Sequence, residues 1–133
     1  MKFLPFYLFF LHSVCFSQFV LDSKLEIEKE FFDSGKLKCI KSFKEGIQHG
    51  KTVFYFETGE KRIEQNYKEG KAHGKVFWYH QNGQIGWEES YNEGIPVGKW
   101  FYYSNDGTVQ AVKEFKEGKE VSYFSKGEKI RVD

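Results

Sequence analysis

The chain has 133 residues, the length of one domain, with 20 Lys and Arg residues against 19 Asp and Glu residues. This near-neutral balance disfavours a nucleic acid as partner, because nucleic-acid-binding proteins carry a clear positive excess on one face. Aromatic residues make up 20% and charged residues 29% of the chain, a composition that suits a thin β-structure with rings on one surface and charges on the other.

The first predicted element is a secretory signal over residues 1–17. Lys2 is followed by an apolar run from Phe3 to Leu11, and the small residues Cys15 and Ser17 precede a predicted cleavage after Ser17. One alternative is an uncleaved anchor helix, although the apolar run is short for a bilayer. The other is a lipoprotein attached through Cys15. The signal predicts an exported protein, located in the periplasm, in the cell envelope or outside the cell.

Removal of this segment changes the charge and the cysteine count. Lys2 is its one charged residue, so the mature chain has 20 − 1 = 19 basic residues against 19 acidic ones. Cys39 then stands as a single cysteine, which has no partner for an intramolecular disulfide. We therefore expect Cys39 to be a small buried core residue.

A repeat domain of four units is predicted over residues 31–128, after a leader and capping strand over 18–30 and before a tail over 129–133. Glycines in three series recur every 24 residues, which indicates a stacked-repeat architecture. The last unit is degenerate, as is usual for a terminal repeat, and Ser122 replaces its third glycine. The structural repeat glycines are Gly35, Gly59, Gly83 and Gly107, then Gly46, Gly70, Gly94 and Gly118, then Gly50, Gly74 and Gly98.

Each unit is predicted to hold two strands. The first alternates apolar and polar residues, which is the pattern of a half-buried strand. The second follows a lysine and is rich in aromatic residues, as in KTVFYF, KVFWYH and KWFYYS. Connections such as KEGKAHG and QNGQ carry the glycines of tight turns. The expected fold is all-β, a single twisted antiparallel meander of stacked β-hairpin repeats with about 24 residues per repeat. The apolar positions of the first strands are Leu37, Cys39, Phe43, Ile63, Tyr67, Ile85, Trp87, Tyr91, Val109, Ala111 and Phe115.

Recurring residues are predicted to build the scaffold. Equivalent residues lie two strands apart, at about 10 Å, so His49 and His73 cannot share a zinc ion without distortion. The glutamates that precede the turn glycines recur in every unit and are therefore turn residues, not an acid–base pair. We predict no catalytic residue, no metal site and no cofactor. The recurring rings, which we expect to pack as ladders, are Phe43, Tyr67, Tyr91 and Phe115 in the first strands, with Tyr55, Tyr79 and Tyr103 in the second.

Residues that break the repeat are the candidates for a specific function. Most lie in the two central units, where exposed Trp and Tyr side chains are typical of binding hot spots. The alternative is that these rings fill local gaps in the packing. The predicted partner-binding residues are Trp78, Tyr79, His80, Trp87, Trp100 and Tyr102.

At these positions the chain resembles the MORN-repeat variant family, whose members are often labelled YwqK-like antitoxins. The similarity covers about residues 25–128. It implies a twisted sheet of stacked hairpins and carries over no catalytic residue. MORN repeats proper have been linked to membrane attachment and to protein scaffolding or dimerisation. The matching residues are Tyr55, Gly59, Tyr67, Gly70, Gly74 and Trp78 in one unit, and Tyr79, Gly83, Tyr91, Gly94, Gly98 and Trp100 in the next.

Together these features predict a non-enzymatic, exported protein that binds another protein through aromatic sheet faces. Open sheet edges also allow self-association by strand pairing. One alternative is an antitoxin or immunity protein that neutralises a partner toxin. The other is a peripheral membrane protein, in which the lysines beside the aromatic strands, Lys51, Lys75 and Lys99, contact a lipid surface.

Overall fold

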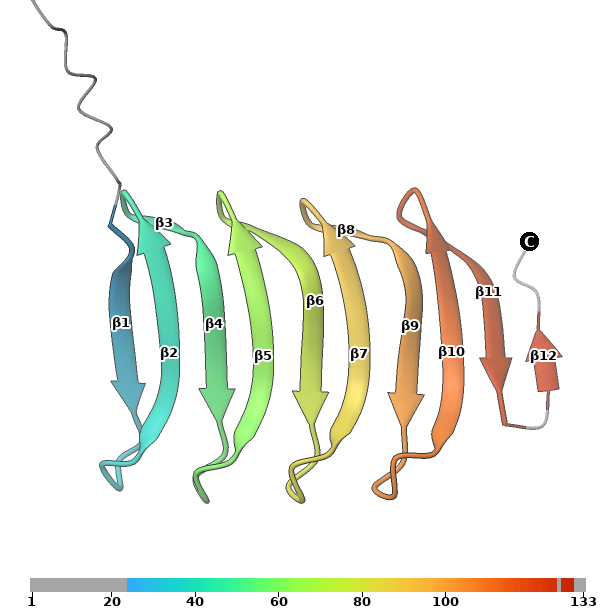
Figure 1. Ribbon diagram of the computed structural model, residues 1–133, viewed down its shortest axis with the longest axis horizontal. Coiled ribbons are helices and arrows are strands. Elements are labelled where there is room, and N and C mark those ends of the chain that lie inside the picture. Colours follow the sequence, from blue (N-terminus) through green and yellow to red (C-terminus); the bar gives the residue numbers. More distant parts are fainter. Residues whose placement is uncertain (1–23, 127, 131–133) are drawn as a thin grey trace, which may run out of the picture.

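The computed structural model describes residues 24–126 and 128–130, and every regular element within them is a β-strand. The strands form one sheet in which sequential neighbours lie side by side and antiparallel (Figure 1). The predicted all-β meander is therefore confirmed. The secretory signal predicted over residues 1–17 and the end of the predicted tail, residues 131–133, lie outside the described residues. The strands are β1 (Glu26–Phe31), β2 (Leu37–Lys44), β3 (Ile47–Gln48), β4 (Gly50–Tyr55), β5 (Lys61–Lys68), β6 (Lys71–Tyr79), β7 (Ile85–Asn92), β8 (Ile95–Pro96), β9 (Gly98–Tyr103), β10 (Val109–Lys116), β11 (Lys119–Ser125) and β12 (Glu128–Ile130).

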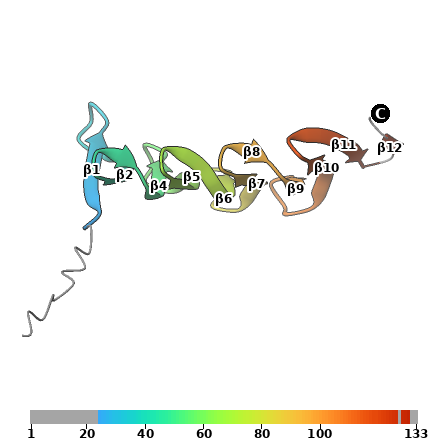
Figure 2. The ribbon, with the colours of Figure 1, turned by 90° about the horizontal axis from the view of Figure 1, so that it is seen from above.

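The sheet is open and one layer deep. Its strand order is β1-β2-β4-β5-β6-β7-β9-β10-β11-β12, with β3 paired to β2 and β8 paired to β7 as short extensions of the turns. Figure 2 shows the sheet from above, and within residues 24–126 and 128–130 neither a helix nor a second sheet covers a face. Both faces are therefore open to solvent or to a partner, and β1 and β12 are the two edges.

The turn between the two strands of a unit is tighter than the sequence suggested. Lys44 pairs directly with Ile47, which leaves Glu45 and Gly46 as the two turn residues, with φ angles of 53° and 75°. Positive φ at both central positions is the type I′ turn, whose twist matches that of the flanking strands. A residue with a Cβ is uncommon at positive φ. The equivalent glutamates nevertheless have the same conformation, and these are Glu69, Glu93 and Glu117.

The third glycine of each unit does not belong to this turn, contrary to the seven-residue connection predicted from the sequence. Gly74 lies inside β6, where the pairing with β5 shifts register between Gln65 and Tyr67. Its φ is 86°. The glycine therefore forms a bulge that restores the pairing of the second strand after the turn.

The turn between units ends in a second bulge. At the turn after β6, the Gly83 amide donates a hydrogen bond to the His80 carbonyl at 2.9 Å, and the His80 amide donates one to the Gln84 carbonyl at 2.8 Å. Trp78 then pairs with Trp87 while Tyr79 pairs with Ile85, so Gly86 is one extra residue in β7. The bulge places Ile85 on the face opposite Trp87, whereas the sequence pattern put both residues on one face.

The two faces differ in chemistry. We call one the tryptophan face, because the pairing of β6, β7 and β9 places Trp78, Trp87 and Trp100 on it. The other, the lysine face, carries Lys51, Lys75 and Lys99 at positions that alternate with those residues.

The core is the layer of small side chains that lies directly against the sheet. Cys39 and Thr52 are 0% exposed and Val76 is 2% exposed, all on the tryptophan face, while Val53 and Ser42 are buried on the lysine face. Burial raises the pKa of the Cys39 thiol. The prediction that Cys39 is a buried core residue is confirmed. Because the sheet has a single layer, aromatic rings from neighbouring strands must shield these small side chains from solvent.

Candidate functional site

The six predicted partner-binding residues do not form one surface. Trp78, Trp87, Trp100 and Tyr102 lie on the tryptophan face, since Trp78 pairs with Trp87 and Trp87 pairs with Tyr102. Tyr79 follows Trp78 in β6 and therefore lies on the lysine face. His80 lies beyond β6, in the turn. The surface with most of the predicted residues is the tryptophan face.

Trp87 is the most exposed of the three tryptophans. Its side chain meets Trp78 edge to face, with ring centroids 5.7 Å apart and ring planes at 82°. Edge-to-face contact is a favoured arrangement for aromatic rings. Trp87 is nevertheless 44% exposed, so its ring has a large apolar surface available for contact with another molecule.

Trp100, in contrast to Trp87, packs against neighbouring rings of the sheet. Its ring lies 4.3 Å from Phe115 and 5.1 Å from Tyr91, measured between centroids. Its indole N–H donates a hydrogen bond of 3.1 Å to the Ser90 carbonyl. Burial is the main cause that raises the pKa of the neighbouring Tyr91, with a smaller contribution from Glu89. Trp100 therefore fills the space between two ladder rings, as the alternative interpretation of these rings proposed.

His80 holds two units together. Its Nε2 lies 3.0 Å from the carbonyl oxygen of Tyr103, in the next unit. The ring rests against Gly86, where a Cβ would come within 2.9 Å of His80 Cε1 and 3.0 Å of Nε2. Gly86 and His80 are therefore a matched pair, and the absence of a side chain at Gly86 makes room for the imidazole.

We expect Gly86→Ala to destabilise the protein by about 1–3 kcal/mol, because the new methyl group forces the His80 ring from its site. The φ of Gly86 is not in the positive range that disfavours alanine. His80→Ser, which copies Ser104 of the next unit, removes the clash. The double variant should therefore lose less stability in urea unfolding than the sum of the single variants. Strict additivity would contradict the proposed clash.

Tyr79 lines a hollow on the lysine face, in addition to its contact with the hollow beside Trp87. Tyr79, Ile85 and Tyr103 line a volume of about 550 Å³ beside the turn glycines Gly83 and Gly107. Tyr79 and Tyr103 also contact aromatic rings two residues earlier in their own strands, at 6.5 and 6.2 Å. The predicted ladder of second-strand tyrosines is thus on the face opposite Trp87.

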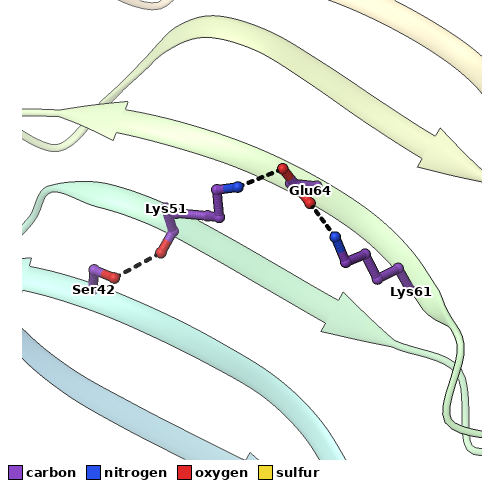
Figure 3. Close-up of polar contacts among 4 residues, drawn as sticks. All are labelled: Ser42, Lys51, Lys61 and Glu64. Carbon is purple, nitrogen blue, oxygen red and sulfur yellow. Dashed lines mark hydrogen bonds and ion pairs between the residues drawn. The ribbon is translucent and has the colours of Figure 1, made fainter.

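Ion pairs occupy much of the lysine face. Glu64 lies between Lys51 and Lys61, whose ammonium groups are 2.6 and 2.7 Å from its two carboxylate oxygens (Figure 3). Lys75 pairs with Glu88 in the same way one unit later. In the next unit Val112 stands at the position of these glutamates, so the pattern stops. Hydrogen bonds from Lys51 and then Lys61 lower the pKa of the Glu64 carboxyl.

The Glu64 pairs predict a pH dependence of stability. A carboxylate with a lowered pKa in the folded state stabilises the protein above its unfolded pKa, about 4.3, and this stability is lost as the pH falls through the folded pKa. Both lysines are at least half exposed, so we expect a loss of only about 1 kcal/mol. Urea unfolding at pH 7 and pH 3 should show a larger loss for the wild type than for Glu64→Gln. Equal losses would show that the pairs contribute nothing.

The two recurring histidines lie at the turn end of the sheet. The Glu69 amide donates a long hydrogen bond of 3.4 Å to Nδ1 of His49. Nδ1 of His73 is buried and has no hydrogen-bond partner in the described part of the chain. Over residues 24–126 and 128–130, no three or more His, Cys, Asp or Glu side chains gather where they could hold a metal ion. No helix long and apolar enough to span a membrane occurs in the same ranges.

Arg62 is a site residue that the sequence reasoning missed. It occupies the bulge position of β5, where the other units have Lys38, Gly86 and Gln110. Its guanidinium carbon lies 5.9 Å from the centroid of the Phe56 ring. A comparison of the four units residue by residue would have shown it, since it is the single arginine of the repeats.

Comparison with protein families agrees with the hairpin architecture. The family model described as MORN repeat variant matches residues 27–45, 48–69 and 72–85. Comparison with curated proteins gives no match. Among solved structures, the crystal structure of accessory secretory protein 1,2 and 3 in Streptococcus pneumoniae is similar at 17% identity and a TM-score of 0.44. The similarity covers 75% of this chain, which spans only 19% of that one.

Proposed function

Three stretches of the chain, residues 27–45, 48–69 and 72–85, match the MORN repeat variant family, and from that similarity we propose that the protein is a non-enzymatic module that binds another protein through its tryptophan face. MORN repeats generally mediate interactions with proteins or membranes. The observation that supports a protein partner is Trp87, which is 44% exposed in the middle of a sheet face where Trp100 is half-buried against Phe115. A large, half-exposed indole held by a neighbouring ring is typical of a binding hot spot.

The charge of the edge strand favours a different protein over a second copy of this chain paired at the sheet edge. The edge strand β1 carries Glu28 and Glu30 where the later second strands have uncharged residues on the tryptophan face. Charges on an edge strand oppose strand addition. Glu30 is also paired with Lys41, which neutralises part of this charge.

The lipid alternative has weaker support. A membrane surface attracts a protein by about 1 kcal/mol for each free basic residue. Lys51 and Lys75 are already paired with Glu64 and Glu88, which leaves Lys99 without an ion pair among the described residues. The three lysines therefore provide less free positive charge for membrane binding than the amino-acid sequence suggests.

Co-purification with matched variants tests the proposal. The tagged protein is incubated with cell-envelope extract, and bound proteins are identified by mass spectrometry. We expect one stoichiometric partner that is lost on Trp87→Ala and retained on Phe124→Ala. Phe124 is the control because it is also 44% exposed but lies on the lysine face. Equal loss with both variants, or no retained protein, would reject the proposal. A toxin as the partner would make the chain an antitoxin, and the N-terminal residue of the native protein would test export.

A further inference from the structure

A hollow of about 430 Å³ lies beside the exposed Trp87, at the end of the sheet where the turns between units lie. Its lining includes Phe56 and Arg62 from one unit and Trp78, His80, Gln81 and Trp87 around the next turn. Of these residues, Arg62 and His80 occupy positions where the other units carry different side chains. As a set, the side chains that line the hollow therefore differ from those at the corresponding positions of the other units.

Arg62 supplies this hollow with a positive charge that no acid compensates. Among residues 24–126, no carboxylate lies within 4.0 Å of its guanidinium group. The closest acid in sequence, Glu64, is held by Lys51 and Lys61. The Phe56 ring lies beside the guanidinium carbon, at 5.9 Å, and a cation–π contact of this kind fixes the side chain without neutralising it.

Trp78 supplies a hydrogen-bond donor that has no acceptor. Its indole N–H is buried and unpaired within the described residues, whereas the equivalent group of Trp100 is bonded to the Ser90 carbonyl. A buried unpaired donor costs about 1–3 kcal/mol. The exposed Trp87 ring packs against Trp78, and both residues line the hollow, so a small shift of the Trp87 ring opens this donor to a ligand that packs on that ring.

We propose that the hollow binds a carboxylate of an extended segment of the partner protein, an Asp or Glu next to an apolar residue. The inference rests on the proposed function. The planar guanidinium of Arg62 matches a carboxylate with two parallel hydrogen bonds, and the Trp78 N–H donates to one of the same oxygens. The apolar neighbour of the acid packs on the Trp87 ring. His80 stays bound to the Tyr103 carbonyl and forms a fixed wall.

The position of the site favours a peptide over an anionic lipid surface. Membrane attachment depends on several basic residues that reach the headgroups together. Lys51, Lys75 and Lys99 lie on the opposite face from Trp87. The tryptophan face carries Glu28, Glu30 and Glu89 in the rows that pass the hollow. Glu30 is paired with Lys41, but Glu28 and Glu89 would repel an anionic membrane. A single guanidinium group beside aromatic rings can bind the single carboxylate of a peptide, but it is not enough to attach the protein to a membrane.

The test is a titration of the full ¹⁵N-labelled chain, followed by NMR, with two capped peptides that differ at one residue. Acetyl-Gly-Phe-Glu-Gly-amide carries the carboxylate, and acetyl-Gly-Phe-Gln-Gly-amide has an amide in its place. We expect the Glu peptide to shift the Arg62 Nε–H signal and the indole signals of Trp78 and Trp87 saturably. The Gln peptide should bind roughly tenfold more weakly or worse. The indole signal of Trp100 serves as the internal reference because its donor is already bonded.

Two variants distinguish specific binding of the carboxylate in the hollow from general electrostatic attraction. Arg62→Gln should abolish the difference between the two peptides. Lys38→Gln removes the same charge from the equivalent position of the first unit, outside the hollow, and should leave that difference intact. Equal binding of both peptides, or equal effects of the two variants, would overturn the proposal. So would shifts of the same signals by phosphatidylserine vesicles when the Glu peptide causes none.

The co-purification distinguishes failure of this site from failure of the interaction module. A partner that is lost on Trp87→Ala but fully retained on Arg62→Gln would leave the proposed function standing and reject the carboxylate. The absence of any partner would reject the proposed function, while the peptide titration still reports on the hollow by itself.

Discussion

Replacement of Trp100 by alanine is expected to lower the free energy of unfolding by about 2–4 kcal/mol, slightly less than the removal of a fully buried ring, because Trp100 is half-buried. Trp100 fills the gap between Tyr91 and Phe115, whose ring centroids lie 5.1 and 4.3 Å away. The variant also leaves the Ser90 carbonyl without its indole donor. No second layer covers this face in the described part of the chain, so neighbouring side chains must fill the gap or water enters it.

Urea unfolding of Trp87→Ala provides the comparison. Trp87 is already 44% exposed, so less apolar surface is lost from the folded state, and we expect a cost of about 1 kcal/mol. Trp100→Phe keeps a ring but removes the N–H, and it should fall between the two alanine variants. If Trp87→Ala proved as destabilising as Trp100→Ala, the division between a packing tryptophan and a binding tryptophan would be wrong.

The difference between these two tryptophans was beyond the reach of the sequence. Both residues break the repeat, and both were grouped as partner-binding candidates. Their exposure depends on the rings beside them: Trp100 lies between two members of the ladder, while Trp87 has an edge-to-face contact with Trp78. Those contacts depend on which residues pair across strands, and the register is set by bulges that leave no simple signal in the pattern of apolar residues.

The glycine period, by contrast, was enough to predict the architecture. Each unit repeats the same turn residues, so the antiparallel meander and the spacing of equivalent strands follow directly. The failures are local. Ile85 lies on the opposite face from Trp87 because Gly86 is an extra residue in β7, and Gly74 forms a bulge inside β6 instead of closing a turn. Arg62 stands out when the units are compared residue by residue, but its free charge depends on the fold, which places no carboxylate of residues 24–126 within 4.0 Å of its guanidinium group.

Deletion of residues 66–89 is expected to leave a folded protein that is one unit shorter. The deletion removes 24 residues and joins Gln65 to Ser90, which is the equivalent of Asn66. The fused strand can then pair with β4 through its first half and with β9, as β7 does now. Stability in repeat proteins is close to a sum over units and their nearest neighbours. The urea m-value should therefore fall by roughly a quarter, because it scales with the surface exposed on unfolding.

A deletion of 23 residues, 66–88, is the decisive control. It joins Gln65 to Glu89 and leaves one additional residue inside a strand, so the side chains beyond the junction point to the wrong face unless a new bulge forms. Circular dichroism and urea unfolding should show a folded 24-residue deletion and a largely unfolded 23-residue deletion. Equal stability of the two deletion variants would mean that the fold does not depend on which side chains lie on which face of the sheet. Because the 24-residue deletion also removes Trp78 and Trp87, it should lose the protein partner while the sheet remains folded, which separates the scaffold from the site it carries.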